Sequence, residues 1–137
     1  MKLMFASDIH GSYFYVEKLK EVILHDGLQT ISDRAFEHCV QLKKINIPDT
    51  VTRIGEYAFS RSMISSITIG DGLTVPRGAF ANCTSLTDIE LSSNLENIAN
   101  GLFENCEALA EFKILSAIFV GVSFFKGKSI SLILLDL

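Results

Sequence analysis

An aromatic residue preceded by a small or aliphatic one returns along this chain at nearly equal intervals. The motif occurs as Ala35-Phe36, Ala58-Phe59, Ala79-Phe80 and Leu102-Phe103, which places the phenylalanines 23, 21 and 23 residues apart. Self-similarity at a period of roughly 20–50 residues is typical of repeat architectures, in which one unit cannot bury its apolar side chains without its neighbours. We therefore expect a stack of short units whose core continues from each unit to the next.

Each unit carries further residues at matching positions. Three residues after the phenylalanine stands Cys39, Ser62, Cys83 or Cys106. An alternating apolar pair follows, namely Ile45 and Ile47, Ile67 and Ile69, Ile89 and Leu91, or Phe112 and Ile114. The next unit then opens with Leu28 and Ile31, Val51 and Ile54, Leu73 and Val75, or Leu95 and Ile98. Alternation over so few residues predicts a short, half-buried strand in each unit, and the opening residues are expected to point inward as well. The second unit is one residue short between Ser62 and Ile64.

Residues 47–59 read Ile-Pro-Asp-Thr-Val-Thr-Arg-Ile-Gly-Glu-Tyr-Ala-Phe and resemble the leucine-rich repeat of BspA-type surface proteins. The resemblance extends over residues 27–114. It implies a leucine-rich-repeat array of about four units with short parallel strands. Members of that family are often secreted or surface proteins that adhere to host proteins or to other cells. The resemblance therefore implies a protein-binding or adhesion-type module without catalytic activity.

The strands themselves predict where a protein partner would bind. If the apolar pairs point inward, their neighbours point outward and form two columns on one sheet face. These neighbours are Lys44, Asn46, Ser66, Thr68, Asp88, Glu90, Glu111 and Lys113. Solenoids often bind partners on such an extended surface, although an ordinary solvated sheet face would look the same. Tyr, Trp and Arg are absent from the columns, so any one contact is expected to be weak unless several act together.

The amino terminus contains a different pattern. Residues 2–6 form a candidate strand, Ser7-Asp8-Ile9-His10-Gly11 a turn, and residues 12–25 a candidate helix with Val16, Leu19, Val22 and Ile23 on one face. We expect this strand and helix to cap the first repeat, because the end of an array exposes apolar surface.

The stretch Met1 to Gly11 is similar to the start of calcineurin-like metallophosphoesterases, especially the YfcE-type phosphodiesterases. The resemblance implies that Asp8 and His10 would bind one metal of a dinuclear site, for example Mn²⁺. Two ligands cannot complete a site that normally takes four or more. The later Gly-His-x-His element of that family is also missing. We therefore expect neither enzyme activity nor a cofactor, and we keep a metal-dependent phosphodiesterase, or its truncated remnant, as the alternative.

Residues 115–137 lie beyond the repeats and are strongly apolar. Apolar segments on both sides of Lys126-Gly127-Lys128 predict a hairpin that caps the far end. Self-association through this segment is the alternative. The longest apolar run, Ala117 to Phe125, is shorter than the ~18–20 residues of a membrane-spanning helix, so no membrane span is expected.

Composition narrows the classes of partner. The net charge is −4 and the Lys and Arg residues are scattered, which argues against nucleic-acid binding.

The cysteines are expected to be buried free thiols, because Cys39, Cys83 and Cys106 are odd in number and occupy one repeat position. The amino terminus shows no secretion signal, which would make the sequence as it stands cytoplasmic, whereas the resembling family is often cell-surface or secreted, so the location stays open.

These observations predict an α/β solenoid in three parts. Residues 1–26 form the strand-turn-helix segment, residues 27–114 the leucine-rich repeats, and residues 115–137 the hydrophobic hairpin or cap. A folded product of gene fragmentation that has no function is a further hypothesis. The sequence does not choose between it and a binding module.

Overall fold

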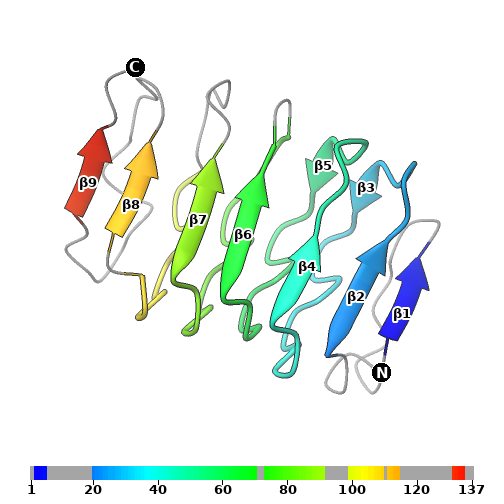
Figure 1. The fold of residues 1–137 in the computed structure, drawn as a ribbon, viewed down its shortest axis with the longest axis horizontal. Coiled ribbons are helices and arrows are strands. Elements are labelled where there is room, and N and C mark those ends of the chain that lie inside the picture. Colours follow the sequence, from blue (N-terminus) through cyan, green and yellow to red (C-terminus); the bar gives the residue numbers. More distant parts are fainter. Residues whose placement is uncertain are drawn as a thin grey trace.

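The structure, a computed structural model, describes residues 2–5, 20–70, 73–91, 99–109, 111–114 and 131–134. These residues form nine short strands (Figure 1). The strands are β1 (Lys2–Phe5), β2 (Glu21–Leu24), β3 (Thr30–Ile31), β4 (Lys44–Asn46), β5 (Arg53–Ile54), β6 (Ser66–Ile69), β7 (Asp88–Leu91), β8 (Glu111–Ile114) and β9 (Ser131–Leu134).

Seven of the strands lie side by side in one row along the long axis of the molecule (Figure 1). β1 pairs with β2, β2 with β4, β6 with β7, and β8 with β9, and every pairing is parallel. In register, Val22 lies beside Ile45 and Ile67 beside Ile89, so each strand of a pair repeats the apolar positions of the other. The parallel strands that the repeat pattern predicts are confirmed.

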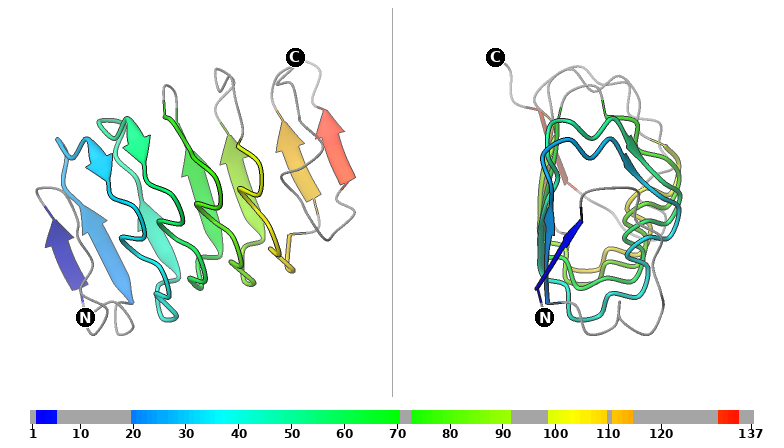
Figure 2. Two further views of the ribbon diagram at one scale, coloured as in Figure 1. Left: turned by 180° about the vertical axis from the view of Figure 1, so that it is seen from behind. Right: turned by 90° about the vertical axis from the view of Figure 1, so that its right-hand side faces the viewer.

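The chain returns from each strand to the next through a second wall (Figure 2). We call the strand row the strand wall, and the segments around residues 30–39, 53–62, 74–83 and 99–106 the turn wall. The turn wall contains the small parallel β3–β5 sheet. Its turns are also hydrogen bonded across units, because the amides of Arg34, Phe36 and His38 donate to the carbonyls of Glu56, Ala58 and Ser60. Backbone polar groups thus find partners in the neighbouring unit rather than in a helix.

The core between the two walls is built around the repeated phenylalanines. The rings of Phe36, Phe59, Phe80 and Phe103 stack in sequence with centroid separations of 5.2, 5.3 and 5.8 Å. All four side chains are at most 1% exposed. Stacked aromatic pairs contribute about 0.5–1.5 kcal/mol each beyond the area they bury. This column carries the core from one unit to the next, as the spacing predicts.

The three cysteines are buried free thiols, as expected. The Sγ of Cys83 donates to the carbonyl of Phe59 at 3.1 Å, and the Sγ of Cys106 donates to the carbonyl of Phe80 at 3.2 Å. Ser62 takes the same place in its unit and is 1% exposed, with its Oγ 3.5 Å from the Sγ of Cys83. At this position the side chain is small and buried, and in Cys83 and Cys106 it donates a hydrogen bond to the preceding unit.

The prediction of a helix over residues 12–25 is wrong for its carboxyl-terminal part, because Glu21–Leu24 form the strand β2. Val22 and Leu24 are buried, whereas Glu21 is exposed, so the side chains alternate as in the other strands. A short apolar run fits a strand or a helix, and pairing with both β1 and β4 selects the strand. Residues 6–19, with the rest of the expected helix, lie outside the described residues. Since the described residues contain no helix, that part of the chain is a β solenoid rather than the α/β solenoid expected.

The carboxyl-terminal strand β9 pairs in parallel with β8, a pairing that does not test the predicted hairpin. The first arm of the expected hairpin, residues 117–125, lies outside the described residues. With β2 before residue 27 and β9 after residue 114, the strand wall extends past both expected limits of the repeat array.

Candidate functional site

The outer surface of the strand wall, which we call the strand face, carries the residues predicted to bind a partner. Lys44, Asn46, Thr68, Asp88 and Glu90 are exposed and Ser66 is half-buried. The intervening Ile45 and Ile67 are buried, so the predicted alternation is correct on β4 and β6. The register places Ser66 beside Asp88 and Thr68 beside Glu90. Glu111 and Lys113 belong to β8, but their side chains lie outside the described part.

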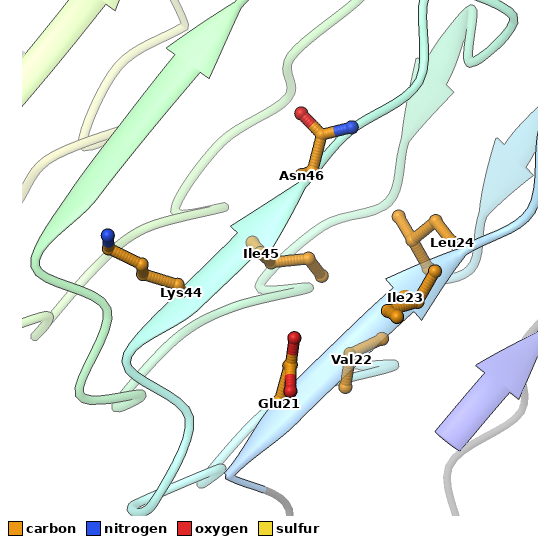
Figure 3. A pocket seen from close by; sticks show the side chains of 7 residues that line it. All are labelled: Glu21, Val22, Ile23, Leu24, Lys44, Ile45 and Asn46. Atoms are coloured by element: carbon orange, nitrogen blue, oxygen red, sulfur yellow. The ribbon is translucent and has the colours of Figure 1, made fainter. Parts of the chain in front are cut away.

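The sequence reasoning missed two residues of this face, Glu21 and Ile23, because it assigned them to a helix. In register, Glu21 lies beside Lys44 and Ile23 beside Asn46, so β2 extends both columns by one strand. Figure 3 shows these side chains around a pocket of about 180 Å³. The signal in the sequence is the spacing, because Glu-Val-Ile-Leu stands 23 residues before Lys-Ile-Asn-Ile, although Ile23 is apolar where Asn46 is polar.

Among the described residues, no strand ladder joins β4 to β6 or β7 to β8, so the strand wall is interrupted at both junctions. At the first junction, β4 pairs with β2 and β6 pairs with β7. One backbone hydrogen bond links the two units just ahead of these strands, from the Ser65 amide to the Lys43 carbonyl at 3.1 Å. Past this bond a second hollow opens, with a volume of about 220 Å³. Its lining residues are Ile45, Asn46, Ile47, Asp49, Ser66, Ile67, Thr68 and Gly70.

The carboxylates on β7 are held by neighbouring hydroxyl groups. Thr87 Oγ1 donates to Asp88 Oδ2 at 2.7 Å, and Thr68 Oγ1 donates to Glu90 Oε2 at 3.4 Å. These contacts fix two negative charges on the outer surface, two residues apart on one strand. The strand face is thus acidic on β7 and polar but uncharged on β6.

Arginine is found on the turn wall instead. The chain has four arginines, at positions 34, 53, 61 and 77, and all are exposed there. The Arg61 Nη1 donates to His38 Nε2 at 3.0 Å, since a guanidinium has no acceptor, and Arg53 lies 3.8 Å from the Asp33 carboxylate. These contacts engage the guanidinium groups of Arg53 and Arg61 within the protein, so the clustering of arginines does not by itself form a binding site.

Tyr57 explains why a glycine occupies position 78. Arg34, Tyr57, Gly78 and Gly101 stand at one repeat position and all have positive φ. A Cβ at Gly78 would lie 2.4 Å from Cε1 of Tyr57, so the tyrosine ring occupies the space that a side chain would need. The Arg34 guanidinium lies 5.9 Å from the centroid of the same ring. These four residues of one repeat position thus lie next to one another in the turn wall.

The metal-binding residues of the alternative hypothesis, Asp8 and His10, lie outside the described residues. Within the described part there is no group of three or more His, Cys, Asp or Glu side chains placed to hold a metal ion. Burial raises the pKa of Cys39 to about 12, of Cys83 to about 11 and of Cys106 to about 12. The thiols are therefore protonated at neutral pH, a form that neither attacks an electrophile nor binds a metal well.

The model of the BspA type leucine rich repeat region matches residues 7–131 with six copies of the repeat. The match begins ahead of residue 27 and ends beyond residue 114, in agreement with the extended strand wall. It includes Asp8 and His10, and nothing in the comparisons supports the resemblance of residues 1–25 to metallophosphoesterases. No curated protein matches the chain.

Among solved structures, the chain is similar to a leucine-rich repeat protein from Bacteroides ovatus ATCC 8483, with 31% sequence identity and a TM-score of 0.74. The similarity covers 82% of this chain but only 31% of the Bacteroides protein. The chain thus corresponds to less than a third of that longer protein. In the described residues, no helix has the length and hydropathy needed to cross a membrane.

Proposed function

Because the chain belongs to the BspA-type leucine-rich-repeat family, we propose that it is a protein-binding or adhesion-type module that acts through its strand face and has no catalytic activity of its own. The observation that carries the proposal is the pair of outward columns on the strand face. Exposed polar side chains from β2, β4, β6 and β7 stand there above a buried apolar core. Solenoids characteristically use such a surface to contact an extended stretch of another protein.

The chemistry of the face suggests how strong the interaction is. The tightest interfaces depend on buried Tyr, Trp and Arg anchors, and the described strands carry none of these on the strand face. A single face of this kind binds weakly, and several in one longer array bind more strongly, because the second contact is then intramolecular. The greater length of the Bacteroides protein is consistent with this arrangement.

The test compares two variants of equal charge. In the first, Lys44, Asn46, Asp88 and Glu90 on the strand face are all replaced by Ala. In the control, Arg77, Gln29, Asp26 and Glu56, which are exposed but lie off this face, are replaced by Ala. Each set removes one positive charge, two negative charges and one amide, so nonspecific charge effects are matched.

Wild-type and variant proteins are used as bait in pull-downs from cell extracts, and the captured proteins are quantified. We expect the strand-face variant to capture at least tenfold less of one specific protein than the wild type does. The control variant should capture the same amount of that protein as the wild type. Equal capture by all three proteins would exclude the strand face as the binding surface.

A further inference from the structure

We propose that the hollow between β4 and β6 is an anchor site for an arginine side chain of the protein partner. We call it the β4–β6 groove, lined by Ile45, Asn46, Ile47, Asp49, Ser66, Ile67, Thr68 and Gly70. The proposal rests on the proposed function, because it assigns the most specific contact on the strand face. It also adds a residue, Asp49, that the alternating columns do not include.

The groove lies between two strands that no ladder joins. The space between β4 and β6 measures about 220 Å³. Pockets that enclose a drug-sized ligand measure roughly 300–1,000 Å³. The groove is therefore the size of one side chain.

The polar groups of the groove are rich in hydrogen-bond acceptors. Asp49 supplies a carboxylate, Asn46 an amide oxygen, and Ser66 and Thr68 hydroxyl oxygens. The hydroxyl of Thr68 already donates its hydrogen to Glu90, so only its lone pairs remain for a ligand. This set of groups favours a ligand with several N–H donors.

The charge of the groove selects a cation. Asp49 is its single charged lining residue. Lys44, the nearest cationic neighbour on β4, lines the adjacent β2–β4 pocket instead. Among the described residues, no side chain forms an ion pair or hydrogen bond with the Asp49 carboxylate, which leaves it available to a partner. A guanidinium can bind a carboxylate through two parallel hydrogen bonds and still has donors left for the hydroxyls.

The apolar part of the groove suits the stem of the same side chain. Ile47 is half-buried at the groove, beside the buried Ile45 and Ile67. The methylene groups of arginine pack on such surfaces while the charged end makes polar contacts. Gly70 lies beside the carboxylate, because a Cβ added there would be in van der Waals contact with Asp49 Oδ1 at 3.7 Å.

The proposal is tested by titrating the isotope-labelled full chain with three blocked peptides while backbone amide shifts are followed by NMR. The peptides are Ac-Ala-Arg-Ala-NH2 and its citrulline and lysine versions. We expect the arginine peptide to shift the backbone amide signals of residues 45–47, 49 and 66–70. We expect the citrulline peptide, which has the same shape without the charge, to bind at least tenfold more weakly, and the lysine peptide several-fold more weakly. Equal binding of either peptide would overturn the assignment to arginine.

Three variants locate the contact. Asp49→Asn removes the charge with little change in shape and is expected to weaken arginine-peptide binding at least tenfold. Gly70→Val fills the groove and is expected to have a similar effect. Asp26→Asn makes the same chemical change at an exposed carboxylate off the strand face and should alter affinity less than twofold. If Asp49→Asn binds the arginine peptide as tightly as the wild type does, the groove is not the arginine site. Amide spectra of the free variants show whether each is folded.

The result is separable from the test of the proposed function. If the arginine peptide fails to bind while the four-residue strand-face variant still loses its partner, the strand face is correct and the arginine anchor is wrong. If the peptide binds as expected while that variant captures its partner normally, the groove is correct and the strand face is not the protein-binding surface.

Discussion

The chemistry of a side chain in this molecule depends on its position in the repeat. The three cysteines, which share one repeat position, are the clearest example. Cys39, Cys83 and Cys106 occupy the place of Ser62, with the side chain buried against the preceding unit. Burial raises their pKa values to between about 11 and about 12, above the ordinary 9.0. The folded state thus binds protons that the unfolded state releases as the pH rises above 9.

This difference predicts a loss of stability in alkali. Because the folded pKa values are raised, the contribution of the thiols is complete below about pH 9 and disappears as the pH rises toward about 12. Each thiol can remove up to about 1.4 kcal/mol of unfolding free energy per pH unit in that range. Denaturant titrations between pH 8 and pH 11 measure the effect.

The control for this prediction is the triple variant Cys39→Ser, Cys83→Ser and Cys106→Ser. Ser62 shows that a hydroxyl is accepted at the position, and a serine does not titrate in this range. The triple variant should lose less stability than the wild type between pH 9 and pH 11. Parallel curves for the two proteins would mean that the thiols do not cause the alkaline loss.

At the scale of elements, β2 gives the sharpest test, since the strand and the expected helix orient its side chains differently. In the strand, Leu24 is 5% exposed and Ile23 is half-buried on the outer surface. Leu24→Ala should therefore reduce the free energy of unfolding by about 2–5 kcal/mol. Ile23→Ala should reduce it by on the order of 1 kcal/mol, because less apolar surface is lost. Chemical denaturation of the two variants decides between the strand and the helix. A larger loss of unfolding free energy for Ile23→Ala than for Leu24→Ala would favour the helix.

The sequence predicts most of the strand wall because its signal is local and repeated. Ile45, Ile67 and Ile69 are buried where the alternation places them, and the phenylalanine period gives the aromatic column. The sequence does not predict β2, because Val22-Ile23-Leu24 is apolar at every position and shows neither a strand nor a helix periodicity. Only the neighbouring strands β1 and β4 distinguish the two structures.

The candidate site is less predictable than the strands. Alternation places Lys44, Asn46 and Thr68 on the outer surface, and these residues are exposed. It cannot place Asp49, which follows the end of β4 and lines the groove between the unpaired strands β4 and β6. The missing residue between Ser62 and Ile64 precedes β6 and marks the same junction in the sequence. The gap between β4 and β6 depends on how two units pack together. The alternation signal in the sequence lies within a single unit and does not report that packing.

For the whole molecule, stacking accounts for both the fold and the expected kind of activity. Each unit offers one strand, one turn segment and one phenylalanine to its neighbours, so added units lengthen the strand face without changing its architecture. Such a body presents one repeated surface, which suits contact with an extended partner. An enzyme instead needs different groups converging on one point.

The same reasoning predicts that the chain does not hydrolyse phosphodiesters. A dinuclear centre needs several ligands for each metal, and Asp8 and His10 provide two in total. We expect hydrolysis of bis(p-nitrophenyl) phosphate with added Mn²⁺ to equal the rate with metal alone. We also expect the Asp8→Ala and His10→Ala variants to be indistinguishable from the wild type. Turnover above the metal blank that both substitutions abolish would show that these side chains recruit further ligands, for instance from a second copy of the chain. Turnover that survives both substitutions would instead point to a contaminating phosphodiesterase, since a reaction that depends on this motif cannot persist without its two ligands.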